Sequence, residues 1–503
     1  MRSILERKVN FISILLAILI AIGATLTSFS YFFGLVLIMM VMLAVILLLV
    51  TKKIGLTAFL IYSYLAFLAF NVEYPLIFIG DYGFSNEHPG GLRAAIVVNH
   101  FFILITTTFL IGVLKKKKYE IPLNIEIILW AILIFIGSIS LFFADNHYAV
   151  FYPLIRNLSI LLFLVVFSNF KLDYLWDSFK KSLIYFLIPF QFFVGLYQYI
   201  FVEPLGLRFL GESNNPFRST IVVAESQHGM SGTFGHPGIF GLFFIMIMSF
   251  ILNDLLNKNK EATKRERTFT FISFVMGVSL ILMTDSRASI ALFAFISLIL
   301  IVLNLYINKK MKKGLFKIFM ISASLVMIIT TVLALRAEEL IERFLGSDLL
   351  YQVSYRGGLN EISLDILTQH VGTFLFGIGL NNYTDVVQKM GSGFAYSHPV
   401  HNFYLLLTAE GGISQGLIYS GLIAIIIIKM GIVIRRSKDL LLIRKAIVVL
   451  TSILALTLYN FTGWAAYHNQ NYYLFAFLVV LSILITRNYR AERKRVNAGA
   501  PKL

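Results

Sequence analysis

The chain lacks cysteine altogether and carries little charge. The absence of cysteine among 503 residues excludes disulfide bonds and thiolate chemistry, and it gives no indication of the redox compartment. Charged residues make up 14% of the chain and hydrophobic residues 58%, and the mean hydropathy is +0.82. A soluble protein of this length would be far more polar. The composition therefore indicates a membrane protein.

Several familiar motifs are also missing. The chain contains no Walker loop and no dinucleotide-binding fingerprint, and no serine lies in a nucleophile elbow. No internal repeat is visible. The basic segment 1–8 is followed by an apolar run that passes Phe29 without a small-residue cleavage site. We therefore expect a first spanning helix there, and no cleavable signal peptide.

What the sequence has in abundance is long apolar runs. A run of about 20 residues can cross a bilayer as a helix. We expect about fourteen such spans, and hence an all-α polytopic membrane protein. The expected spans are 9–29, 31–50, 54–78, 94–114, 124–143, 153–168, 183–202, 238–256, 269–284, 288–307, 315–335, 413–434, 446–467 and 472–486.

Basic clusters set the expected orientation. They fall in every second loop, as at 115–118, 258–267 and 309–317, and at both termini. The positive-inside rule therefore places these loops and both termini in the cytoplasm. The same rule accounts for the formal charge of +17 without nucleic acid as a partner.

Histidine and arginine mark the opposite, outer side. Only nine basic residues fall there, eight of them arginine, and all nine histidines lie in or beside these loops. Arginine suits phosphate, and histidine is the commonest acid–base residue. Polar residues also collect in ordinary loops, but the cytoplasmic loops are equally polar and contain no histidine. We therefore expect chemistry on the outer face.

The long outer intervals divide the chain. We expect N-terminal membrane helices at 1–202, further helices with a first outer loop at 203–335, a large outer catalytic loop at 336–412, and C-terminal helices with a basic cytoplasmic tail at 413–503. Within the large loop, apolar residues recur at helical spacing from Leu359 to Val371, with polar residues between them. This pattern predicts an amphipathic helix on the membrane surface or over a cavity.

Two arginines are candidates for function. Arg287 stands where one expected span reaches the outer surface and the next begins, and an ionisable residue at such a position is a functional candidate. The alternative is a snorkelling arginine paired with Asp285. Arg356 opens the amphipathic segment, and its alternative is a solvated loop charge.

Two histidines, His398 and His401, close the large outer loop. Asn402 is beside them and Glu410 precedes a glycine pair, after which we expect an apolar helix to start near Ile413. A metal site would need more than two ligands, so none is expected here.

These residues together resemble the superfamily of O-antigen ligases and polymerases, which are membrane glycosyltransferases. The resemblance covers roughly residues 200–475 and rests on the order and topology of the motifs. Its motifs are Asp285-Ser-Arg-Ala, Arg356 before Phe376-Gly-Ile-Gly-Leu-Asn-Asn382, His401-Asn402 followed by Gly411, and Gly232-Thr-Phe-Gly-His-Pro. His236 stands where many relatives carry asparagine, and fourteen spans exceed the family's usual dozen or so.

The resemblance implies a mechanism. The donor would be a glycan on undecaprenyl diphosphate at the outer face of the bacterial cytoplasmic membrane. Arg287 and Arg356 would clamp the diphosphate, and His401 would take the proton of the acceptor hydroxyl, with inversion and without metal or cofactor. The implied substrate-binding residues are Arg218, His236, His398, Asn402 and Glu410.

The function that this resemblance favours is polymerisation of lipid-linked repeat units into O-antigen, capsule or exopolysaccharide. A ligase that transfers finished glycan to a terminal acceptor is the alternative within the family. A transporter or flippase is the alternative from another class, and it would place polar groups at the bilayer midplane within pseudo-symmetric repeats. Expected partners are the lipid-linked donor and acceptor, membrane lipids and a chain-length regulator.

Overall fold

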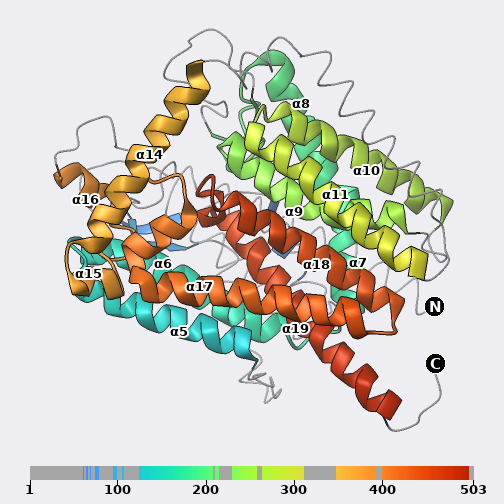
Figure 1. Cartoon of the computed structure of the whole chain (residues 1–503). Coiled ribbons are helices and arrows are strands. Elements are labelled where there is room, and N and C mark those ends of the chain that lie inside the picture. The colour runs from blue at the N-terminus through green and yellow to red at the C-terminus, as the bar shows by residue number, and fades with distance from the viewer. Residues whose placement is uncertain are drawn as a thin grey trace, which may run out of the picture.

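The computed structural model describes six stretches of the chain, one pair of strands and a few single residues. The stretches are 124–207, 210–213, 229–257, 263–310, 347–390 and 399–497. The strands are β1 (Tyr74–Phe78) and β2 (Ala94–Val98), and the single residues are Ile61, Tyr64, Leu65, Leu68, Ala69, Ile105 and Thr106. Apart from the strand pair, the regular structure in these parts is helical (Figure 1).

Nine helical segments in the described residues are long and apolar enough to cross a membrane. They are α5 (Ile125–Ile139) with the 3-10 turn η2 (Ser140–Phe143), α6 (His147–Phe167), α7 (Leu172–Ser182) continued through the π-turn η3 (Leu183–Leu187) into α8 (Ile188–Phe201), α9 (Pro237–Leu256), α10 (Lys264–Met283), α11 (Arg287–Lys310), α17 (Phe403–Arg436), α18 (Leu440–Tyr459) and α19 (Asn469–Asn497). Each overlaps one expected span, which confirms a helical, polytopic membrane protein. The expected spans 9–29, 31–50, 54–78, 94–114 and 315–335 lie wholly or largely outside the described residues.

Two of those spans contain strands where helix was expected. β1 pairs antiparallel with β2. The expectation of helix is therefore wrong at the end of the span 54–78 and at the start of the span 94–114. Pro75 disfavours a helix interior because it has no N–H to donate. Val97 and Val98 are β-branched residues, which favour strands.

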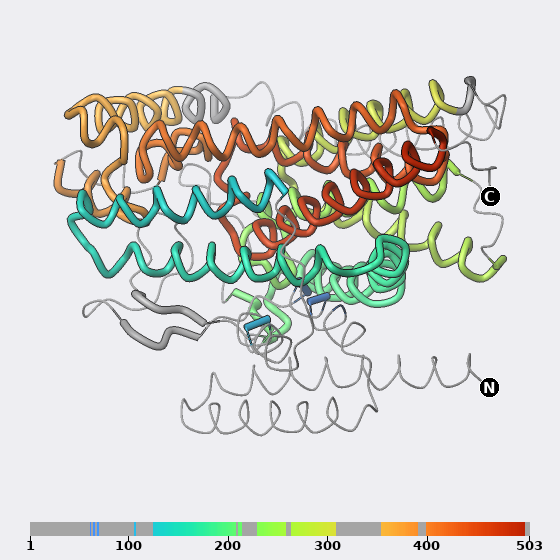
Figure 2. The backbone as a smooth tube through the Cα atoms, turned by 90° about the horizontal axis from the view of Figure 1, so that it is seen from below, coloured from blue at the N-terminus to red at the C-terminus, as the bar shows by residue number. Residues whose placement is uncertain are grey.

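The helices run side by side and leave two chemically different ends. The short helices α15 (Val371–Phe376) and α16 (Tyr383–Lys389) lie with α14 (Ser347–Thr368) at the end opposite the C-terminus, which we name the loop end (Figures 1 and 2). The other end, named the basic end, carries cationic contacts. Lys180 pairs with Asp254 at 2.7 Å, and Arg487 donates to the Ser168 carbonyl at 3.0 Å.

The amphipathic segment of the large loop is α14. Leu359 and Ile366 are fully buried, whereas Glu361 and Asp365 are exposed, so the predicted pattern is confirmed over this stretch. The pattern ends earlier than expected, because Val371 begins α15 and is 76% exposed.

The boundaries of α17 and α18 correct two expectations. α17 starts at Phe403, ten residues before the expected Ile413, and is interrupted at Gly412. There φ is 75°, and a Cβ would lie 2.2 Å from the Leu375 carbonyl oxygen, so only glycine fits without strain. α18 ends at Tyr459, whereas the sequence predicted a span to residue 467.

The interruption of α17 has a local cause. The carbonyls of Ala409 and Glu410 accept bonds from the Ile378 and Gly379 N–H groups, both at 3.0 Å. Regular helix would direct these carbonyls to residues four positions later. The loop before α16 therefore takes over bonds of the helix, and α17 bends at Gly412.

Candidate active site

Arg287 is the first residue of α11, at the loop end. The turn from α10 is tight, because Asp285 adopts the left-handed backbone conformation with φ 50°. The Ser286 hydroxyl then accepts a bond from the Ser289 N–H at 3.4 Å, which helps to start the helix. The guanidinium therefore stands where the partial positive charge of a helix N-terminus also acts.

Arg356 comes from α14 and is half-buried. Burial lowers the pKa of its guanidinium, and the positive charge of Arg287 lowers that pKa further, while Tyr459 acts in the opposite sense. The two arginines and the tyrosine thus lie within electrostatic range of one another, although 69 positions separate Arg287 from Arg356 in sequence. Two neighbouring guanidinium groups form a setting suited to an anion.

Tyr459 connects this pair to α9. A Cβ built on Gly238 would lie 2.6 Å from the Tyr459 hydroxyl, so the first turn of α9 passes directly beside the end of α18. His236 precedes that turn, and its Nδ1 accepts the Gly238 N–H at 3.0 Å. The His236 ring also lies 5.9 Å from the Trp464 ring, centroid to centroid.

His401 is tied to the same end of α18 from the other side. The Phe403 N–H, two residues later, donates to the Asn460 carbonyl at 2.8 Å, and the Tyr404 hydroxyl donates to the Thr457 carbonyl at 3.3 Å. These bonds hold the half-buried His401 close to the residues that follow Tyr459. The structure therefore gathers His236, Arg287, Arg356 and His401 around the end of α18.

Helix polarity adds to the positive charge there. The helices α9, α11 and α17 begin at Pro237, Arg287 and Phe403, next to the residues gathered around the end of α18. The N-terminus of a helix carries partial positive charge and exposes N–H groups. With Arg287 and Arg356 nearby, the arrangement suits a phosphate or diphosphate.

Two of the expected substrate-binding residues have structural contacts. The Asn402 side-chain oxygen caps α17 by accepting the Tyr404 and Leu405 N–H groups at 3.0 and 3.2 Å. Glu410 is only 1% exposed, and its carboxylate accepts the Tyr383 N–H at 3.4 Å. Asn402 therefore stabilises the start of α17, and Glu410 holds the start of α16 against α17. Arg218 and His398 lie outside the described residues.

Two residues at the loop end were not singled out in the sequence. Tyr459 lay inside an expected span, and only the polar Asn460 and Gly463 after it indicate a helix end. Arg156 is one of the eight arginines that the sequence assigns to the outer side, but it is only 7% exposed. It donates to the Tyr467 carbonyl at 2.6 Å and lies 4.5 Å from the Tyr472 ring, so it joins α6 to the start of α19.

Metal ligands do not gather in the part of the chain that the structure describes. No three His, Cys, Asp or Glu side chains lie close enough there to hold a metal ion. The expectation of metal-independent chemistry remains a prediction.

Comparison with protein-family models gives no match, and neither does comparison with curated protein sequences.

Proposed function

We propose that the chain is a membrane glycosyltransferase that polymerises lipid-linked oligosaccharide repeat units. The observation that carries the proposal is the convergence of Arg287, Arg356 and His401 at one end of an apolar helical bundle. Two cations suit a diphosphate, and an imidazole suits proton transfer. Their setting at the end of membrane helices suits a substrate that is anchored in lipid.

The proposed reaction is a direct displacement. A hydroxyl oxygen of the acceptor sugar attacks the anomeric carbon of the donor, and the bond from that carbon to the phosphate oxygen breaks. The diphosphate leaves on its lipid with the bonding electron pair, and Arg287 and Arg356 stabilise its growing charge. His401 takes the proton from the attacking hydroxyl. A single displacement of this kind inverts the anomeric configuration.

The proposed setting is the bacterial cytoplasmic membrane with the loop end outside. The basic end carries Lys180, Lys438 and Arg487, and cationic residues of membrane proteins are enriched on the cytoplasmic side. This distribution supports an outward-facing site. The proposal takes undecaprenyl diphosphate as the lipid carrier and a chain-length regulator as a further partner.

The test is reconstitution of the full chain with a lipid-linked repeat unit. Wild-type protein should yield a ladder of longer lipid-linked products. Gel electrophoresis and mass spectrometry measure the length and amount of these products. His401→Ala should lower the rate by ~10²–10⁴-fold, as loss of a general base does. Arg287→Ala and Arg356→Ala should each lower it by ~10²–10³-fold, as loss of an electrostatic contact to the leaving group does.

Matched controls separate chemistry from folding. Arg436→Ala and His370→Ala alter exposed residues and should leave the rate within about twofold of wild type. A well-folded His401→Ala protein with full activity would contradict the general-base role. Transfer of the glycan to a terminal acceptor in place of a lengthened lipid-linked chain would favour a ligase.

Full activity in a strong chelator is expected, because the proposed reaction uses no metal ion.

A further inference from the structure

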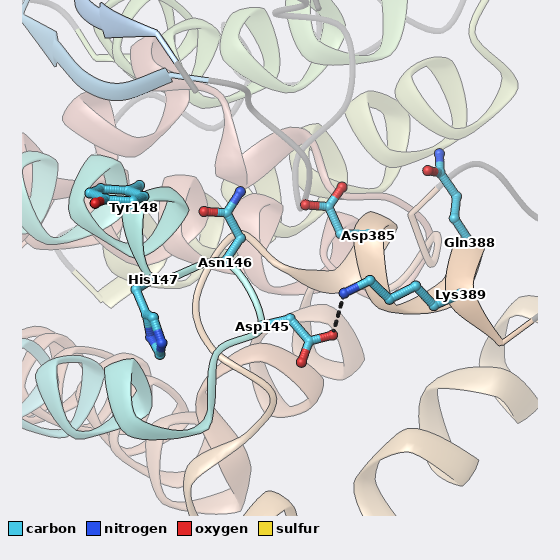
Figure 3. A pocket seen from close by; sticks show the side chains of 7 residues that line it. All are labelled: Asp145, Asn146, His147, Tyr148, Asp385, Gln388 and Lys389. Atoms are coloured by element: carbon cyan, nitrogen blue, oxygen red, sulfur yellow. Dashed lines mark hydrogen bonds and ion pairs between the residues drawn. The ribbon is translucent and has the colours of Figure 1, made fainter. Parts of the chain in front are cut away.

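A pocket lined by residues with polar or charged groups lies at the loop end beside α16. It has a volume of about 550 Å³, within the ~300–1,000 Å³ typical of ligand pockets. One wall is the turn between η2 and α6, and the other wall is α16 (Figure 3). The lining residues are Asp145, Asn146, His147, Tyr148, Asp385, Gln388 and Lys389.

The two walls are held together by direct bonds. Asn382, which precedes α16, accepts the Asn146 N–H at 2.8 Å and donates from its own amide to the Asn146 carbonyl at 3.2 Å. Lys389 reaches from α16 to Asp145 at 2.9 Å, as the dashed line in Figure 3 shows. The pocket is therefore formed by a fixed arrangement of two segments more than 230 residues apart.

The charges of the lining do not suit a phosphate. Asp145 and Asp385 bring two negative charges against the single positive charge of Lys389, and that lysine is already paired with Asp145. This pocket therefore differs in charge from the site of Arg287 and Arg356 at the end of α18. The pocket would repel a diphosphate, whereas the two arginines would attract it.

The polar groups of the lining suit a sugar. Gln388 offers an amide donor and acceptor, Asn146 offers an amide donor while its oxygen caps α6, and Asp385 offers an acceptor. Pairs of such groups match the hydroxyls of a sugar ring. Tyr148 is 65% exposed and presents a rigid aromatic face with a polar hydroxyl, a combination that favours ring contacts. His147 donates from Nδ1 to the Leu141 carbonyl at 2.8 Å, which directs Nε2 away from that bond.

The pocket also has a defined relation to the proposed site. Asn382 adjoins Tyr383, whose N–H bonds to Glu410 on α17. Glu410 lies seven positions, or roughly 10 Å of helix, beyond Phe403 at the start of α17. A sugar in the pocket would thus lie away from the reacting bond but at the same end of the bundle.

We propose that this pocket binds an uncharged sugar residue of the glycan substrate, remote from the bond that forms. The inference rests on the proposed function, because the glycan there is the substrate of the arginine and histidine cluster. Binding at a distance from the reacting end holds a growing chain in place between additions. Loss of the contact should weaken substrate binding and shorten the products.

The test compares Tyr148→Ala and Gln388→Ala with wild type in the reconstituted full chain. The probe is the lipid-linked repeat unit isolated from the cells that naturally produce this protein. Loss of one ring or hydrogen-bond contact should raise KM by ~5–10-fold and leave kcat within about twofold, with a shorter mean product. Tyr174→Ala, which alters an exposed tyrosine of α7, should match wild type. Unchanged KM and product length would overturn the pocket's role.

A second measurement separates this inference from the proposed function. The probe is the free oligosaccharide released from the same lipid by mild acid, and its binding is measured by calorimetry. If the oligosaccharide binds to wild type and binds more weakly to Tyr148→Ala, the pocket is supported. This holds even if wild type makes no polymer, a result that would overturn only the proposed function. Absence of binding, or equal binding by Tyr148→Ala, overturns the pocket as a sugar site.

Discussion

Arg356 lies within electrostatic range of Arg287, and burial together with this second positive charge lowers the pKa of the Arg356 guanidinium. The two residues belong to different helices, α14 and α11, so the tertiary structure has placed like charges within electrostatic range of each other. Such a pair repels in the absence of a ligand and attracts an anion strongly.

Inorganic pyrophosphate should stabilise the protein through this arginine pair. At a concentration a hundredfold above its Kd, it should add ~2.7 kcal/mol to the free energy of unfolding. Arg356→Ala should abolish the rise in Tm measured in detergent. Arg436→Ala should keep the rise in full. An equal rise in Arg356→Ala would show that pyrophosphate binds elsewhere.

Gly238→Ala should destabilise the protein through Tyr459. The added Cβ would meet the Tyr459 hydroxyl at 2.6 Å, and its next neighbours are His236 ring atoms at 3.2 and 3.3 Å. Overpacking of this kind costs ~1–3 kcal/mol. The double variant Gly238→Ala/Tyr459→Phe should recover most of the lost Tm, because it removes the oxygen. Equal Tm values for the single and double variants would contradict this contact.

Gly412→Ala should be severely destabilising, and Gly431→Ala provides the control on the same helix. Alanine at position 412 would combine a positive φ of 75° with a backbone oxygen 2.2 Å from its Cβ. A loss of roughly 2–5 kcal/mol is expected. Gly431 has nothing within 4 Å of the added atom, so its variant should be neutral or gain up to ~1 kcal/mol. Similar Tm values for the two variants would refute the kink.

Stability should fall below neutral pH because of His468. Burial lowers the pKa of His468 to about 3, and Arg156 and His236 act in the same direction. The unfolded chain therefore binds a proton between about pH 3 and 6.5 that the folded chain refuses, so stability rises with pH across this window. At pH 5 the loss relative to pH 7 should be about 2 kcal/mol.

His468→Gln should remove much of that pH dependence. The measurement is the difference in Tm between pH 7 and pH 5, compared among wild type, His468→Gln and the exposed control His370→Gln. The control should follow wild type. If His468→Gln loses as much Tm as wild type on acidification, another group dominates the effect.

The sequence predicted most of the described helices, but not all of their ends. Apolar periodicity is a local property, so α9 and α11 begin within a residue of their expected starts. α17 begins ten residues early because Asn402 caps a short apolar stretch, Phe403–Leu407, that was too brief to count as a span. β1 escaped prediction because strand pairing depends on a distant partner, β2.

By itself, the sequence determined that this is a helical membrane protein whose basic clusters alternate with its expected spans. The reason is that the length of an apolar run and the charge of a loop are local properties of the sequence. It also singled out Arg287, Arg356 and His401 as candidates. Only the tertiary structure decided which of the candidates meet. It brought Arg356 to Arg287, buried Glu410 and Arg156, and joined α16 to the turn before α6. Such contacts depend on packing between segments far apart in the chain, which no local pattern encodes.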